Sequence, residues 1–188
     1  MRRTMSKVLM FASILIISLL LVISCGKGKK DIEEMEADEV STSESTHEEA
    51  ALPGADAAEL WKYITETSPY EEWNGWPGKE GHIPGNAPHG AIIRTFLSGH
   101  GAHNVQDPEK GTFENGQIIV KENFMPDTTL AAITVMYKVE GFNPDAADWF
   151  WAKYKPDGTV DAAGIPKGCV TCHGAKADND YVMLGSLK

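Results

Sequence analysis

The sequence is poor in positive charge. Lysine and arginine together number 17 against 27 aspartate and glutamate residues, which gives a formal net charge of -10 at pH 7. Binding to nucleic acid needs a basic surface that attracts phosphates, so nucleic acid is not an expected partner. An acidic chain is better suited to small neutral molecules or to a basic redox partner protein.

Cysteine is also scarce, with three residues in a chain of 188. Cys25 follows an N-terminal apolar segment, whereas Cys169 and Cys172 form a Cys-x-x-Cys pair near the C-terminus. Lipid attachment would use Cys25 and haem attachment would use Cys169 and Cys172, as argued below, so no cysteine remains for a structural disulfide.

The C-terminal pair belongs to the most specific motif of the chain. The sequence Cys169-Val170-Thr171-Cys172-His173 is the attachment signal for a c-type haem. Each thiol adds to one vinyl group of the porphyrin, and the histidine then gives its imidazole to the iron. A chance pair or half of a zinc site is the alternative, although zinc would need further ligands at close spacing. The motif predicts covalent haem c on Cys169 and Cys172, with His173 as the iron ligand.

The N-terminus has the features of an export signal. Basic residues precede an apolar run over residues 8–23, which is slightly shorter than the roughly 18–20 residues of a membrane-spanning helix. Val22-Ile23-Ser24-Cys25 resembles the lipobox of bacterial lipoproteins. We predict a lipoprotein signal peptide over residues 1–24, lipidation of Cys25, and a membrane-anchored protein on the periplasmic side of a bacterial cell envelope. An uncleaved membrane anchor is the alternative.

The rest of the chain divides into a tether and one folded domain. Residues 25–55 are acidic and polar with almost nothing to bury, so we expect a disordered tether. Residues 56–188 are enough for one hydrophobic core, and we expect the haem domain there.

The predicted fold is mainly β (α+β). Residues 56–64 have helical periodicity, with Asp56 as a possible N-cap. Later segments are rich in β-branched and aromatic residues, and short connections between them favour an antiparallel sheet. A C-terminal haem-binding segment closes the domain, with a short helix after His173. The predicted strands are residues 91–97, 117–124, 131–139 and 148–154.

The far side of the iron is open to several interpretations. An electron carrier usually fills the sixth coordination position with methionine or histidine. Met125, in a loop before Pro126, is the best placed of the methionines, and most of the histidines are expected to be solvated. The remaining candidates are Met136, Met183, His82, His89, His100 and His103.

Strand alternation gives one more indication. Lys121 shares a face with Gln117, Ile119 and Asn123, so it either lies exposed on an edge strand or points into a haem pocket. In a pocket, desolvation would lower the pKa of its amine and make it nucleophilic. Arg94 has the same two interpretations, and its guanidinium would suit a propionate or an iron-bound anion.

Several motifs in order resemble the cytochrome P-460 family, which includes the cytochromes c′-beta. These motifs are His89-Gly90, residues 116–122, 132–138 and 148–154, Asp157-Gly158, and the haem motif with Asp180-Tyr181-Val182. The resemblance implies a mainly antiparallel β fold, usually a homodimer, with a five-coordinate c-type haem.

The two branches of the family imply different chemistry. Members of the P-460 type oxidise hydroxylamine and join a lysine covalently to the porphyrin; that lysine corresponds to Lys121, and their pocket arginine to Arg94. The cytochromes c′-beta lack the bond and bind nitric oxide or carbon monoxide in an apolar pocket, for which Phe96 and Phe124 are candidates. The oxidising members also use a pocket carboxylate, whereas residues 133–136 contain no acid.

The sequence therefore predicts an exported c-type haem protein that binds or oxidises small nitrogen species at an open iron site. Hydroxylamine or nitric oxide oxidoreductase activity is possible, with Lys121 and Arg94 as catalytic candidates. A six-coordinate mono-haem electron carrier is the alternative, and an interaction lipoprotein without haem is a third.

Overall fold

The computed structural model describes residues 51–99, 101–106 and 111–185. The predicted signal peptide, Cys25 and residues 25–50 of the predicted tether lie outside the described residues, as does His100. Within the described ranges, none of the helices combines the length and hydrophobicity that crossing a membrane requires.

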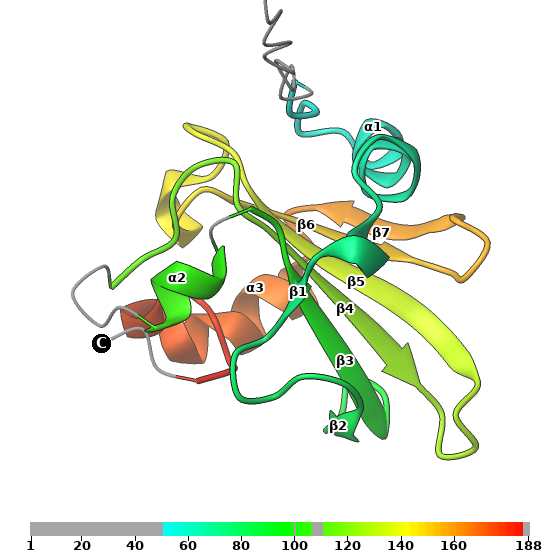
Figure 1. Cartoon of the computed structure of the whole chain (residues 1–188). Coiled ribbons are helices and arrows are strands. Elements are labelled where there is room, and N and C mark those ends of the chain that lie inside the picture. The colour runs from blue at the N-terminus through cyan, green and yellow to red at the C-terminus, as the bar shows by residue number, and fades with distance from the viewer. Residues whose placement is uncertain (1–50, 100, 107–110, 186–188) are drawn as a thin grey trace, which may run out of the picture. The chain divides into compact units, whose positions relative to one another are not determined.

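An antiparallel sheet of seven strands forms the centre of the described domain (Figure 1). Its order is β1-β3-β4-β5-β6-β7, and β2 also pairs with β3. All four predicted strands are confirmed, as β3 to β6. The bounds are β1 Asn74–Gly75, β2 Ile83–Pro84, β3 Ile92–Leu97, β4 Ile118–Phe124, β5 Leu130–Lys138, β6 Trp149–Tyr154 and β7 Val160–Gly164.

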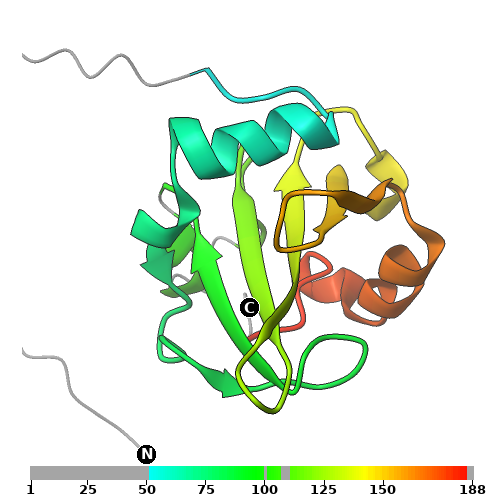
Figure 2. The same ribbon diagram turned by 90° about the vertical axis from the view of Figure 1, so that its right-hand side faces the viewer.

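Helix α1 (Ala57–Lys62) covers one face of the sheet, the face seen in Figure 2. Asp56 caps it as predicted, because its carboxylate accepts hydrogen bonds from the backbone N–H groups of Ala58 and Glu59 at 2.9 and 3.0 Å. A π-helical turn (Tyr63–Thr67) continues α1 and ends at Ser68, before a proline. Leu60 and Ile64 are fully buried against the sheet, and each contributes roughly 1.5–3 kcal/mol to stability.

The opposite face of the sheet is covered by C-terminal and loop segments (Figure 1). Helix α3 (Lys167–His173) and the 3-10 segment Gly174–Asn179 pack there, as does α2 (Gly101–Gln106). A second core cluster fills this side, with Trp76, Trp149 and Trp151 almost completely buried. The haem motif thus lies on the face of the sheet away from α1.

Some elements differ from the predictions. The last residues of the predicted tether contact the domain, since Tyr137 Oη donates a hydrogen bond to the Pro53 carbonyl at 2.7 Å. The short strands β1, β2 and β7 were not predicted, and neither was α2. The remaining 3-10 helices are Tyr70–Glu72 and Pro144–Ala146.

Candidate haem-binding site

Helix α3 presents the haem motif as one unit. It begins after Pro166, an N-cap residue with extended backbone (φ -65°, ψ 120°), and it contains the whole motif. Cys169 and Cys172 are three positions apart on this helix, so their side chains leave it on the same side. Both are free thiols. His173 follows in the last turn and is 7% exposed.

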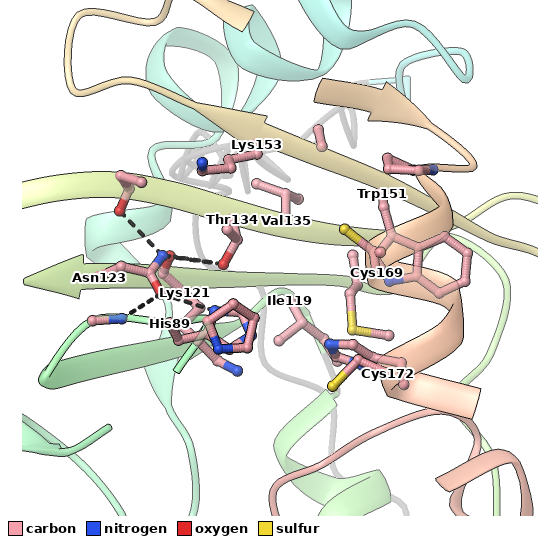
Figure 3. Close-up of a pocket in the computed structure, with 18 of the residues that line it drawn as sticks. His89, Ile119, Lys121, Asn123, Thr134, Val135, Trp151, Lys153, Cys169 and Cys172 are labelled. Carbon is pink, nitrogen blue, oxygen red and sulfur yellow. Dashed lines mark hydrogen bonds between the residues drawn. The ribbon is translucent and has the colours of Figure 1, made fainter. Parts of the chain in front are cut away.

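These three side chains line a cavity of about 710 Å³, which falls within the range of ligand pockets in proteins. Figure 3 shows Cys169 and Cys172 on α3 and Lys121 on β4 around this space. Apolar side chains from β4, β5 and β6 form much of the wall, and among the described residues that line it there is no aspartate or glutamate. The other principal lining residues are His89, Ile119, Asn123, Met125, Thr134, Val135, Met136, Trp151, Lys153 and Pro166.

The imidazole of His173 is oriented by a backbone carbonyl. Its Nδ1 lies 2.7 Å from the carbonyl oxygen of Tyr181, and a carbonyl oxygen can only accept. Nδ1 therefore carries the proton and Nε2 keeps a free lone pair, the arrangement that metal-binding histidines adopt. Burial lowers the pKa of His173, which also favours the neutral ring.

The carbonyl that orients His173 is held by a buried ion pair. Asp180 and Tyr181 have φ values of 53° and 62°, a left-handed conformation that surrounding contacts must stabilise. Lys138 Nζ donates to both carboxylate oxygens of Asp180 at 2.6 and 2.8 Å, and Trp149 Nε1 donates to the Asp180 carbonyl at 2.8 Å. This network fixes the segment that ends at the Tyr181 carbonyl.

Lys121 points into the cavity from the middle of the sheet (Figure 3). Its strand β4 lies between β3 and β5, so the interpretation as an exposed edge residue is wrong. The predicted alternation is confirmed, because Ile119 and Asn123 line the same cavity. Burial lowers the pKa of the Lys121 amine to about 8, so a fraction of it is an unprotonated nucleophile at neutral pH.

His89 lies in the loop between β2 and β3 and also lines the cavity. Its Nδ1 is 2.9 Å from the side-chain oxygen of Asn123. Its ring centre is 6.3 Å from that of His173. Burial, followed by the positive charge of Lys121, lowers the pKa of His89 to about 4, so the ring is neutral at pH 7.

Arg94 is not part of the cavity, and its predicted place in a haem pocket is wrong. In the register of β3 and β4, Arg94 is opposite Glu122, whereas Thr95 is opposite Lys121. Arg94 therefore lies on the α1 face, where its Nε donates to Glu122 Oε2 at 2.7 Å. Its guanidinium also lies 4.8 Å from the ring centre of Phe96, which belongs to the core on that side.

The other predicted residues fall into two groups. Met125 and Met136 line the cavity, whereas His82, His103 and Met183 do not, and neither do Phe96 and Phe124. Asn123, Thr134 and Trp151 line it without having been singled out as site residues from the sequence. Of these three, only Asn123 was indicated by the sequence, because strand alternation places it on the same face as Lys121.

The donor set fits a covalently attached haem. Two free thiols on one side of a helix, a histidine with a free Nε2 and an apolar cavity are the components that a c-type haem needs. The group would be held by Cys169 and Cys172, with His173 on the iron. When bound, it supplies iron redox chemistry and a coordination position for small molecules.

Comparison with known proteins agrees with this geometry. The family model of cytochrome P460 matches residues 80–184, more than half of the chain, and this range contains all the residues that line the cavity. A search of curated proteins found no match. The chain therefore belongs to the cytochrome P460 family and is a c-type haem protein whose cofactor is covalently attached haem c with iron.

Proposed function

We propose that this protein is an exported haem c protein that binds or oxidises small nitrogen species, such as nitric oxide or hydroxylamine, at its iron. The family suggests this class of ligand. The observation that carries the proposal is that the haem motif and Lys121 line one largely apolar cavity. Such a wall suits small uncharged ligands, because it is mostly apolar and the amines among its lining side chains are those of Lys121 and Lys153.

In the ligand-binding form, His173 would hold the iron, and the small molecule would take a further coordination position of the same iron. Cys169 and Cys172 hold the porphyrin by thioether bonds. Lys121 lines the same cavity as the motif and has a lowered pKa, so its amine is suited to bond to the porphyrin or to accept a proton from a ligand.

Export through a lipidated Cys25 completes the proposal and keeps the domain on the periplasmic side of the envelope. This part rests on the N-terminal sequence. Export also agrees with the haem motif, because haem c is attached outside the cytoplasm. A homodimer and an acceptor protein for electrons are further proposals, supported by the family resemblance and by the acidic charge of the chain.

Carbon monoxide tests the ligand site directly. The mature protein, made in a host with cytochrome maturation, should show a shifted absorption spectrum when the ferrous form is exposed to carbon monoxide. Hydroxylamine with an artificial electron acceptor then separates oxidation from binding. A ferrous spectrum that carbon monoxide leaves unchanged would remove the ligand-binding proposal, and a colourless protein of haem-free mass would remove haem altogether.

The role of Lys121 has a separate test with a matched control. Lys121 and Lys153 both line the cavity, but Lys153 is exposed and forms an ion pair with Asp161. In a tryptic digest, a bond to haem should appear as a haem peptide joined to the Lys121 peptide, with the Lys153 peptide unmodified. Recovery of unmodified Lys121 peptide in full yield would reject the bond and favour ligand binding without it.

A six-coordinate electron carrier is the second candidate function, and one observation favours it. His89 lies in the cavity with its ring centre 6.3 Å from that of His173. A permanently bound second histidine would leave electron transfer as the main activity. Reduction by a redox partner without any response to carbon monoxide or nitric oxide is the result that this alternative predicts.

A further inference from the structure

Two histidines share the haem cavity, although the motif accounts for only one of them. His173 belongs to the motif, and His89 comes from a loop 84 positions earlier in the chain. We propose that His89 is a second, displaceable axial ligand of the iron, which occupies the sixth coordination position until a small molecule replaces it. This inference rests on the haem c site and deepens the proposed function.

The hydrogen bonds of Asn123 show which nitrogen of His89 is free. Asn123 Nδ2 lies 3.0 Å from the Lys121 carbonyl and 3.2 Å from the Ala132 carbonyl. Because carbonyl oxygens only accept, this end of the amide must be the NH₂ group, and the other end is its oxygen. That oxygen lies 2.9 Å from His89 Nδ1, so Nδ1 must donate to it and Nε2 is left with a free lone pair.

His89 and His173 therefore share the polarity of metal-binding histidines. Each donates its Nδ1–H to an amide oxygen that the fold holds in place, Asn123 for one and the Tyr181 backbone for the other. Such second partners orient the ring and raise the basicity of the nitrogen that binds the metal. A solvated histidine would not need this arrangement.

The spacing of the rings decides between coordination and a looser role. Two imidazoles on opposite sides of one metal have ring centres roughly 6 Å apart, from two bonds of about 2 Å and about 1 Å inside each ring. The observed separation is 6.3 Å. A small molecule hydrogen-bonded between His89 and the iron would add about 3 Å to that span. The distance thus fits an imidazole bound directly to the iron.

The backbone beside His89 is fixed against the sheet. A Cβ atom at Gly90 would lie 2.4 Å from the carbonyl oxygen of Phe124 and 2.5 Å from its nitrogen, so the chain passes directly over the end of β4. Only glycine permits this approach. His89 itself lies in a loop, where a rotation of its side chain would release the iron without breaking a strand.

The resting ferric protein gives the first test. Two histidine ligands make the iron low-spin, so electron paramagnetic resonance and absorption spectra of the holoprotein should be low-spin. His89→Ala should be high-spin, and added free imidazole should restore the low-spin spectrum. His82→Ala is the matched control, because His82 is an exposed histidine outside the cavity, and it should remain low-spin. A high-spin wild-type protein would overturn the proposal.

Carbon monoxide kinetics provide a measurement that needs no variant. In the ferrous wild-type protein, the rate of binding should level off at high carbon monoxide because release of His89 becomes limiting; a rate that stays proportional to concentration contradicts a displaceable ligand. His89→Ala should remove the plateau. A tenfold gain in affinity there would mean that His89 occupies about 90% of the sites. Low-spin iron that never binds carbon monoxide would support ligation by His89 and refute the ligand-binding function.

Discussion

Replacing Asp180 with asparagine should strongly destabilise the domain. Asp180 is 3% exposed and its partner Lys138 is 8% exposed. One carboxylate oxygen accepts from Lys138, and the other accepts from both Lys138 and the Phe113 backbone N–H, at 2.8 Å from each. Asparagine removes the charge and turns one of these acceptors into a donor, which would then face another donor.

The magnitude follows from burial. Breaking a buried ion pair by removing one partner costs about 3–5 kcal/mol, because the remaining charge is left without compensation. Contact of Lys138 with the Trp149 ring, at 4.9 Å from the ring centre, offsets only part of this cost. For a domain of this size, such a loss lowers the melting temperature by on the order of 10–20 °C.

Asp161→Asn is the matched control. It makes the same chemical change in an ion pair with Lys153, but both of these side chains are almost half exposed. Exposed pairs contribute roughly 0–1 kcal/mol. Urea unfolding of the two holoproteins, followed by circular dichroism, measures the difference. Losses within 1 kcal/mol of each other would refute the argument that the Lys138–Asp180 pair is a buried support.

The same variant should change the haem as well as the fold. Asp180 holds the segment whose Tyr181 carbonyl accepts from His173, and a weaker hydrogen bond makes the imidazole a poorer donor to iron. The reduction potential of Asp180→Asn should therefore rise, whereas that of Asp161→Asn should stay at the wild-type value. An unchanged potential in Asp180→Asn would show that the carbonyl keeps its position without the ion pair.

Two further predictions concern stability on the α1 face. Gly158→Ala should cost about 1–3 kcal/mol, because Gly158 has φ +86° and an added Cβ would lie 2.5 Å from Trp61; Gly78→Ala, with φ +72° and open space, should cost less in the same urea assay. Burial raises the pKa of Tyr154 above its usual range, so the unfolded chain loses this proton first as pH rises and stability falls above about pH 10. Tyr154→Phe should lower stability at pH 8, because it removes the hydrogen bond to the Ala57 carbonyl. It should also flatten the decline in stability between pH 9 and 11. Equal slopes of stability against pH for the variant and the wild type would contradict this reasoning.

The sequence predicted what depends on local pattern. The four long strands are dense in β-branched and aromatic residues, and alternation correctly placed Lys121 and Asn123 on one face. Strand β7, with the sequence Val-Asp-Ala-Ala-Gly, has little of that composition. It forms because β6 offers an edge with which to pair, and pairing between strands is not encoded in a short segment.

The positions of Arg94 and His89 depend on tertiary structure, which the local sequence does not encode. For Arg94 the deciding feature is strand register. Arg94 would lie on the cavity face if its strand were shifted by one residue, since a shift of one exchanges the two faces. His89 was grouped with histidines expected to be solvated. Its partner Asn123 is 34 positions away, so only the folded chain reveals that its ring is oriented like that of a metal ligand.

A comparison of two lysines on neighbouring strands supports the proposal that Lys121 takes part in the chemistry of the site. Lys138 is stabilised by both oxygens of Asp180, and its burial is explained by that pair. Lys121 is half-buried, yet the described residues that line its cavity include no carboxylate. Desolvation destabilises the ammonium form and outweighs the opposing effect of Cys172, so the pKa of Lys121 falls to about 8. A fold gains nothing in stability from such a residue, so its position in the cavity is better explained by a reactive amine beside the haem.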